Sequence, residues 1–110
     1  MQLHHVALES TNIQRSVEWY CKNWDASIIY QDVTWALVDL FGTKIAFVTK
    51  GEHPPHVGFN VTNDFLLKNS QGRQIRSHRD GSRFLYIEDP DGNVLEILNW
   101  DHLNESVNTS

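Results

Sequence analysis

Hydrophobic and polar residues alternate along the start of the chain and then change period. Gln2–Glu9 alternates with period two, which predicts a β-strand. Apolar residues then recur at helical spacing, at Ile13, Val17, Tyr20 and Trp24. Thr11 and Gln14 form a capping box that predicts the start of this helix. Strand-like stretches follow at Ser27–Tyr30, Val33–Leu40 and Thr43–Thr49. The first half therefore predicts one strand, one helix and three antiparallel strands.

The second half of the chain shows the same order of patterns. A linker with two prolines, Lys50–Pro55, separates the halves. We expect a short helix over Asn63–Ser70, opened by Thr62 and closed by Gly72. The strands expected around this helix are His56–Val61, Arg73–Ser77, Ser82–Glu88 and Asn93–Trp100. The last two strands form a hairpin whose turn, Asp89–Gly92, has Pro second and Gly fourth, as a type I β-turn prefers.

Short matching sequence segments suggest that the two halves arose by duplication of a unit of about fifty residues. Asp39–Gly42 lies fifty positions before Asp89–Gly92, and His5 lies fifty-one positions before His56. Each predicted sheet has one face for its own helix, so we expect the other faces to curl around a shared cleft. The predicted fold is α+β: two βαβββ modules form an incompletely closed barrel of eight strands that bears a cleft.

The composition is that of a soluble globular domain and excludes several functions. The 110 residues have a net charge of −5, and the nine Lys and Arg residues form no continuous run, which argues against nucleic-acid and membrane surfaces. A single Cys21 excludes an internal disulfide. The N-terminus lacks a signal pattern, so we expect a cytoplasmic chain. We expect one domain over residues 1–100, with modules at 1–50 and 54–100, and a flexible polar tail at 101–110.

Alternation and the internal repeat indicate which residues carry chemistry. His5 and His56 occupy equivalent positions and are expected to face the cleft. Glu96 lies in an apolar strand of the second half, where an unpaired carboxylate is costly to bury. Two imidazoles and one carboxylate suit Fe(II), Mn, Ni or Zn, with further positions open for water and substrate. The position related to Glu96 by the repeat is Ala46, which cannot bind a metal. A structural role for either histidine, as a hydrogen-bonded or surface residue, is the alternative.

Four segments carry a family resemblance: Leu3–Leu8, Asn12–Tyr20, Pro55–Val61 and Asp89–Ile97. In this order they resemble the vicinal oxygen chelate superfamily, which includes glyoxalases, fosfomycin- and bleomycin-resistance proteins and extradiol dioxygenases. The resemblance covers residues 2 to about 100 and implies paired βαβββ modules around a metal-bearing cleft. It also places His5, His56 and Glu96 on the family's ligand positions.

The chain departs from each known subfamily, which leaves the reaction open. Glyoxalase I-like and epimerase-like members fill the position of Ala46 with a ligand, and fosfomycin-modifying members have Thr where Ala7 stands. We therefore expect a small-molecule enzyme, either a glyoxalase-like lyase or isomerase or an Fe(II) dioxygenase, with Glu96 as its catalytic carboxylate. A metal-free binding protein of the bleomycin-resistance type is the alternative.

Several further residues could contact a metal-binding side chain or the substrate, although each also suits an ordinary surface or core position. They are Glu9, Trp35, Arg76, His78, Arg79, Arg83 and Tyr86. The expected partners are a small-molecule substrate and a second copy of the chain in a homodimer. The sequence leaves open whether the two modules of one site come from one chain or from two.

Overall fold

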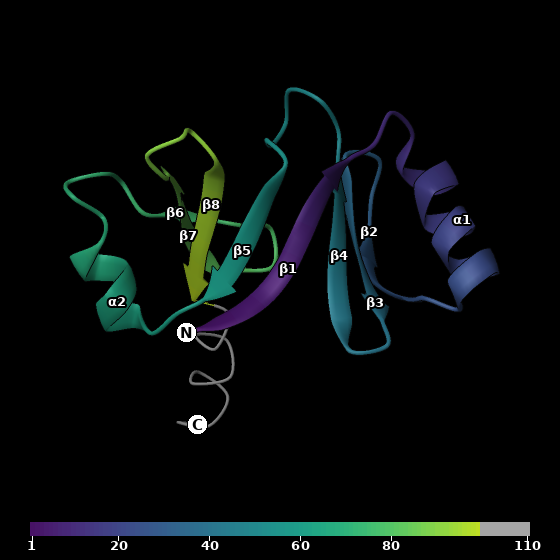
Figure 1. Ribbon diagram of the computed structural model, residues 1–110, viewed down its shortest axis with the longest axis horizontal. Helices are drawn as coiled ribbons and strands as arrows, with labels where there is room; N and C mark the ends of the chain where they lie inside the picture. Colours follow the sequence, from purple (N-terminus) through teal and green to yellow (C-terminus); the bar gives the residue numbers. More distant parts are fainter. Residues whose placement is uncertain (100–110) are drawn as a thin grey trace. The chain divides into compact units, whose positions relative to one another are not determined.

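The computed structural model describes residues 1–99. Within them the elements follow the order βαβββ twice, as predicted (Figure 1). They are β1 (Gln2–Glu9), α1 (Ile13–Trp24), β2 (Ser27–Gln31), β3 (Trp35–Leu40), β4 (Thr43–Val48), β5 (His56–Asn60), α2 (Asn63–Lys68), β6 (Arg76–Ser77), β7 (Arg83–Glu88) and β8 (Val94–Asn99). The predicted α+β class and its two βαβββ modules are confirmed. The expected tail at 101–110 lies outside the described residues.

The chain forms two compact units, and the division falls inside β1 and β5. The first unit is His4–Val57, and the second unit joins Met1–Leu3 to the chain from Gly58 onward. Each unit therefore corresponds to one βαβββ module, except that the first residues of β1 group with the second module and the first residues of β5 group with the first module. Neither helix within residues 1–99 is long and apolar enough to cross a membrane.

In the first unit the strands are hydrogen-bonded in the order β2-β3-β4-β1. β1 and β4 are parallel, with Ala7 opposite Ala46, and the β2/β3 and β3/β4 pairs are antiparallel. One face packs against α1 through a core of Ile13, Val17, Ala36, Val38 and Phe47. The other face carries a second cluster of Ala7, Leu37, Ala46 and Val48. Burial of each larger apolar side chain contributes about 1.5–3 kcal/mol, so both faces stabilise this sheet.

In the second unit the strands follow the order β5-β8-β7-β6. α2 covers one face through Leu66, which packs with Val61, Leu85 and Ile97. Antiparallel pairing of β7 and β8 sets Tyr86 opposite Glu96 and Leu85 opposite Ile97. Because neighbouring residues of a strand point to opposite faces, Glu96 lies on the face that α2 leaves uncovered.

The start of α1 differs from the predicted capping box. Asn12, not Thr11, is the N-cap: its backbone is extended, and its Oδ1 accepts a hydrogen bond of 3.0 Å from the Arg15 amide. Gln14 does not reach back to the cap, because its side chain donates to Glu18. Both Thr and Asn suit this position, so composition alone does not separate them.

The strand predicted at Arg73–Ser77 is shorter than expected. Only Arg76 and Ser77 pair with β7, and α2 already ends at Lys68. Gln71 and Gly72 both have positive φ, 52° and 79°, and the Arg73 amide donates to the Ser70 carbonyl, so a turn ends where the predicted strand was expected to begin.

Candidate metal centre

The turn Asp89–Gly92 sets the register of the strand that carries Glu96. Gly92 has φ of +83° and its amide donates to the Asp89 carbonyl at 3.0 Å, which closes the predicted β-turn. The Asp89 carboxylate also accepts hydrogen bonds from the amides of Asp91 and Asn93. The chain therefore enters β8 at a defined residue, and a slip of one position would move Glu96 to the face covered by α2.

Glu96 is 1% exposed and has a titratable partner within its own unit. The His78 Nε2 atom lies 2.5 Å from Glu96 Oε2. The ring of His78 stacks on Phe84, with 3.6 Å between ring centroids and an interplanar angle of 3°. The stack restrains the orientation of the imidazole, and the contact between His78 and Glu96 offsets part of the cost of burying the carboxyl group.

The environment of Glu96 also affects Tyr86, its partner across the β7/β8 pair. Burial raises the pKa of the Tyr86 phenol far above its usual value, and the negative charge of Glu96 raises it further, while Arg76 opposes this. Tyr86 is therefore a neutral phenol throughout the physiological range.

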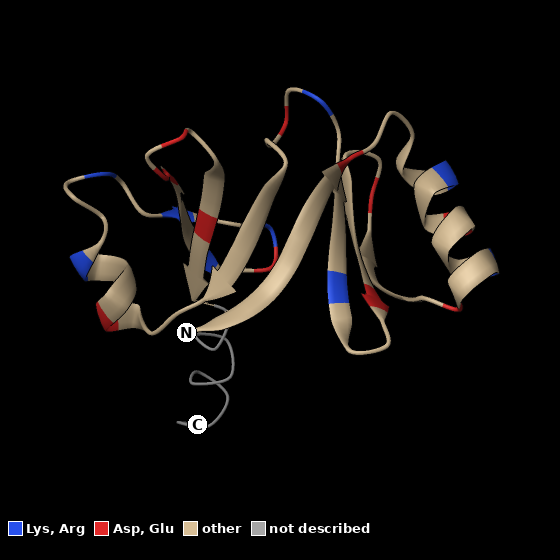
Figure 2. Ribbon diagram, viewed as in Figure 1, with Lys and Arg blue, Asp and Glu red and all other residues tan. Residues whose placement is uncertain are grey.

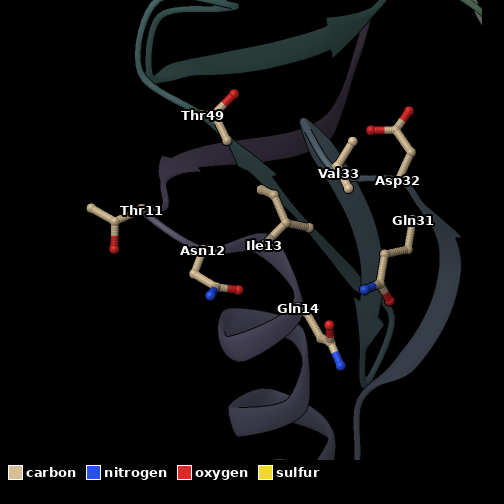
Figure 3. Close-up of a pocket in the computed structure, with 8 residues that line it drawn as sticks. All are labelled: Thr11, Asn12, Ile13, Gln14, Gln31, Asp32, Val33 and Thr49. Atoms are coloured by element: carbon tan, nitrogen blue, oxygen red, sulfur yellow. The ribbon is translucent and has the colours of Figure 1, made fainter.

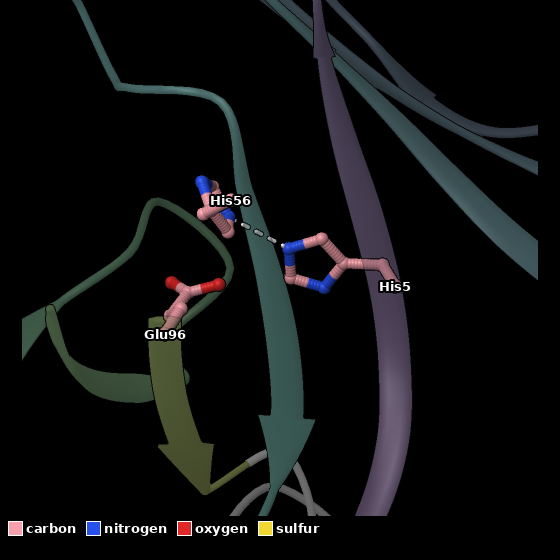
Figure 4. A group of neighbouring side chains, drawn as sticks. All are labelled: His5, His56 and Glu96. Atoms are coloured by element: carbon pink, nitrogen blue, oxygen red, sulfur yellow. Dashed lines mark hydrogen bonds between the residues drawn. The ribbon is translucent and has the colours of Figure 1, made fainter. Parts of the chain in front are cut away.

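His5 and His56 meet within the first unit. His5 lies on β1 and His56 opens β5, and their Nε2 atoms are 2.9 Å apart (Figure 4). The rings pack edge to face, and only 7% of His5 and 8% of His56 is exposed. Glu96, the third ligand expected from sequence, extends from β8 of the second unit.

The proline linker determines the tautomer of His56. The Nδ1 atom of His56 lies 2.6 Å from the carbonyl oxygen of Pro54. A carbonyl only accepts hydrogen bonds, so Nδ1 carries the hydrogen, and in the neutral ring Nε2 keeps its lone pair. This lone pair points toward His5, as a metal-binding imidazole requires.

The donor atoms fit the metal expected from sequence. Neutral imidazole nitrogen and carboxylate oxygen are ligands for Fe(II), Mn, Ni and Zn. The first unit supplies two buried imidazoles with facing nitrogens, and the second supplies a buried carboxylate. Ala46 is buried in the apolar cluster with Ala7, and its side chain has no donor atom.

The other sequence candidates separate into two groups. Arg76 lies on the same face as Glu96, because its guanidinium carbon is 5.8 Å from the centre of the Phe84 ring. Arg83 instead faces α2, since it pairs with Asn99 and alternates with Phe84. Arg83 is therefore removed from the candidate contacts around Glu96, whereas His78 lies in direct contact with Glu96.

Glu9, Trp35 and Arg79 lie in different surroundings. Glu9 is exposed and borders a small hollow beside His53 and Pro54. Trp35 stacks on Tyr30, with 4.4 Å between ring centroids, and packs against the apolar cluster of the first unit. Arg79 is exposed.

A separate cavity of about 590 Å³ opens beside the start of α1 in the first unit (Figure 3). Thr11, Asn12, Ile13, Gln14, Gln31, Asp32, Val33 and Thr49 line it. Asp32 already accepts hydrogen bonds from the amides of Thr34 and Trp35, so it serves the loop before β3. No sequence motif indicated this cavity.

Histidine 4 is the residue of this region that sequence analysis missed. Alternation places His4 and His5 on opposite faces of β1, yet their Nδ1 atoms lie 2.7 Å apart. The sequence shows two adjacent histidines, which could have suggested this contact. Residues adjacent in a strand point to opposite faces, however, so strand periodicity argues against it.

No family model matches the sequence. Several solved structures, however, have a similar fold. Methylmalonyl-CoA epimerase from Mycobacterium tuberculosis has a TM-score of 0.70 at 15% identity, with 89% of this chain and 87% of the epimerase covered. A glyoxalase/bleomycin resistance protein/dioxygenase superfamily member from Vibrio splendidus 12B01 has a TM-score of 0.62 at 12% identity, covering 86% of this chain and 96% of that chain.

A third similar structure carries a different activity in its name. It is described as an NAD-dependent benzaldehyde dehydrogenase from Legionella pneumophila, with a TM-score of 0.63, 20% identity and coverage of 86% of this chain and 96% of that chain. At these identities the likeness establishes the fold and leaves the activity open. The chain has the glyoxalase-like α+β fold found in the glyoxalase/bleomycin resistance/dioxygenase superfamily, as its sequence predicted.

Proposed function

We propose that this protein is a metal-dependent enzyme that acts on a small molecule with two neighbouring oxygen atoms. His5, His56 and Glu96 would hold the metal. The observation that carries the proposal is the pair of facing Nε2 atoms, one of which must present a lone pair because His56 Nδ1 is bound to the Pro54 carbonyl. Superfamily neighbours of known activity, such as the mycobacterial epimerase, act on small molecules, which supports the proposal.

The metal determines which chemistry follows. A bound divalent ion supplies Lewis-acid stabilisation of a substrate oxyanion, and iron in addition supplies chemistry with dioxygen. Glyoxalase-like lyase or isomerase activity suits the first case, and extradiol-type dioxygenase activity suits the second.

The residues around Glu96 would control protons and charge. His78 holds Glu96 Oε2, so the carboxylate keeps one orientation. Tyr86 stays protonated and Arg76 stays charged on the same face, so both groups suit an oxygen-rich, electron-dense substrate. Glu96 is the proposed catalytic carboxylate.

A specific observation favours a second candidate, a metal-free binding protein. Glu96 already meets His78 within its own unit, so its burial does not require a metal ion. Such a protein would bind its ligand tightly in the presence of a chelator, and Glu96→Gln would leave this binding unchanged.

Metal reconstitution distinguishes the two functions. Chelator-stripped protein is loaded separately with Fe²⁺, Mn²⁺, Ni²⁺ and Zn²⁺, and bound metal is measured by mass spectrometry. We expect close to one ion per proposed site in the wild type and in the control His53→Ala, and little in His5→Ala or His56→Ala. Absence of stoichiometric binding for all four metals in the wild type contradicts the enzyme proposal. Oxygen consumption by the iron form then separates dioxygenase from Lewis-acid chemistry.

A further inference from the structure

Each of the two facing histidines has a partner on its other ring nitrogen, and the two partners differ in kind. His56 Nδ1 meets the Pro54 carbonyl at 2.6 Å, and His5 Nδ1 meets His4 Nδ1 at 2.7 Å. The rings of His4 and His5 pack edge to face at 88°, with 5.0 Å between centroids. His4 is 9% exposed, so this contact is buried. All four residues belong to the first unit.

Hydrogen-bond rules restrict the possible tautomers of this chain of rings. Between two ring nitrogens one must donate and the other accept. Because His56 Nε2 holds a lone pair, His5 Nε2 either donates its hydrogen to His56 or presents a second lone pair to a shared cation. In the first state His5 Nδ1 accepts from His4, and in the second state His5 Nδ1 donates to His4.

We propose that His4 is a positioning residue that accepts the Nδ1 hydrogen of His5 and thereby presents the His5 Nε2 lone pair to a divalent metal. In this proposal His4 accepts the Nδ1 hydrogen of His5, just as the Pro54 carbonyl accepts the Nδ1 hydrogen of His56. The inference rests on the proposed function, and it deepens that proposal by naming the residue that orients one ligand. Residues that orient a metal-bound imidazole typically change metal affinity by 10–100-fold when they are removed.

His4 differs from a carbonyl because an imidazole both donates and accepts. Without metal, the three hydrogens lie on His4 Nδ1, His5 Nε2 and His56 Nδ1. With metal, they lie on His4 Nε2, His5 Nδ1 and His56 Nδ1. Each ring carries one hydrogen in both states, so the change from one state to the other moves one hydrogen within His4 and one within His5.

Two substitutions separate the hydrogen-bond acceptor from the shape of the ring. His4→Asn places a carboxamide oxygen near the position of Nδ1, so it keeps an acceptor for His5. His4→Phe keeps a ring of similar shape and has no acceptor. His53→Asn, in the same unit but outside the three rings, is the control. Unfolding midpoints of all variants verify that each is folded at the temperature of measurement.

Zinc affinity and nitrogen NMR test the inference. Titration with Zn²⁺ should give dissociation constants for His4→Asn and His53→Asn within about threefold of wild type, and about 10–100-fold weaker binding for His4→Phe. In ¹⁵N-labelled wild type, long-range ¹H–¹⁵N spectra should show the His5 hydrogen on Nε2 without Zn²⁺ and on Nδ1 with Zn²⁺. His4 should change in the opposite sense.

The possible failures are distinguishable. Zn²⁺ affinity unchanged by His4→Phe, or a His4 tautomer that does not respond to Zn²⁺, overturns the inference and leaves the metal proposal standing. Equal weakening by His4→Asn and His4→Phe also overturns it, because loss of packing alone then explains both. Absence of binding of Zn²⁺, Fe²⁺, Mn²⁺ and Ni²⁺ to the wild type overturns the proposed function and the inference together.

Discussion

Glu96 is almost completely buried, and its contact with His78 offsets part of the cost of burying a carboxyl group. The same contact bears on both candidate functions, because His78 either orients a metal-binding carboxylate or serves as the hydrogen-bond partner of Glu96 in a protein that binds no metal. Substitution of each member of the pair distinguishes these roles.

Removal of the imidazole should destabilise the metal-free protein. We expect His78→Ala to lower the free energy of unfolding by about 1–3 kcal/mol, because a buried carboxylate oxygen loses a charge-assisted hydrogen bond. Urea unfolding of chelator-treated protein measures this value, with His53→Ala as the matched histidine control. If His78→Ala unfolds at the wild-type midpoint, the pair has no structural importance.

Neutralising the carboxylate should affect metal binding more than folding. Glu96→Gln retains the size of the side chain and one oxygen, but amide oxygen is a much poorer ligand than carboxylate for these metals. We expect stoichiometric metal to be lost while the protein stays folded, as measured by metal analysis and circular dichroism. Full metal retention in Glu96→Gln would remove Glu96 from the ligand set.

At the scale of elements, the ends of helices and turns decide where the site residues lie. Asn12 begins α1 directly after β1, and the Asp89–Gly92 turn begins the approach to β8. These local features use small numbers of hydrogen bonds, so each is open to a direct test.

Substitutions at the start of α1 distinguish the predicted N-cap, Thr11, from the observed N-cap, Asn12. Asn12→Ala should cost about 0.5–2 kcal/mol of unfolding free energy, because the Arg15 amide loses its side-chain acceptor. Thr11→Ala should cost less, since the Thr11 hydroxyl accepts a hydrogen bond from the exposed Arg15 guanidinium and does not cap the helix. Parallel denaturant curves compare the two variants, and the opposite ranking would support the predicted capping box.

The hairpin turn should respond to acid. The Asn93 side chain, followed by its backbone amide, holds the pKa of Asp89 below its ordinary value of 3.8. A depressed pKa means that the carboxylate stabilises the fold above pH 3.8 and loses this effect as pH falls through the lower folded pKa. Relative to Asp89→Asn, the wild type should therefore lose more stability between pH 5 and pH 2, measured by thermal unfolding. Parallel pH profiles would rule out this role.

At the scale of the whole molecule, exposed apolar side chains bear on assembly. Trp19, Trp24, Ile28 and Ile29 are each between 45% and 53% exposed in the first unit, and exposed apolar patches mark protein interaction sites. We predict a homodimer, with a sedimentation mass about twice the 12.7 kDa of one chain at micromolar concentration. A mass of one chain under those conditions contradicts the prediction.

The fold was predictable from sequence because its signals are periodic and repeated. The alternation in Gln2–Glu9, the helical stripe through Ile13 and Val17, and the Asp89–Gly92 turn each act locally and agree with one another. The facing of His5 and His56 followed from the repeat. The metal-binding role of these residues and Glu96 stays a prediction, as do the cytoplasmic location and the domain limits.

The remaining contacts were not predictable because they depend on side-chain rotation and on irregular loops. His78 lies after the short strand β6, where no periodicity indicates direction, so its contact with Glu96 needs three-dimensional information. His4 reaches His5 through its rotamer although strand geometry separates neighbours. The choice of Asn12 over Thr11 depends on a backbone angle that both residues accept.

The hydrogen bond between His56 and the Pro54 carbonyl has a consequence for substitution. A main-chain oxygen is present whatever amino acid occupies position 54, so mutation there acts on this bond only through the path of the chain. The partner of His5 is instead encoded by a single codon. Substitution at position 4 therefore removes the side-chain partner of His5 directly, whereas substitution at position 54 leaves a carbonyl in the chain beside His56.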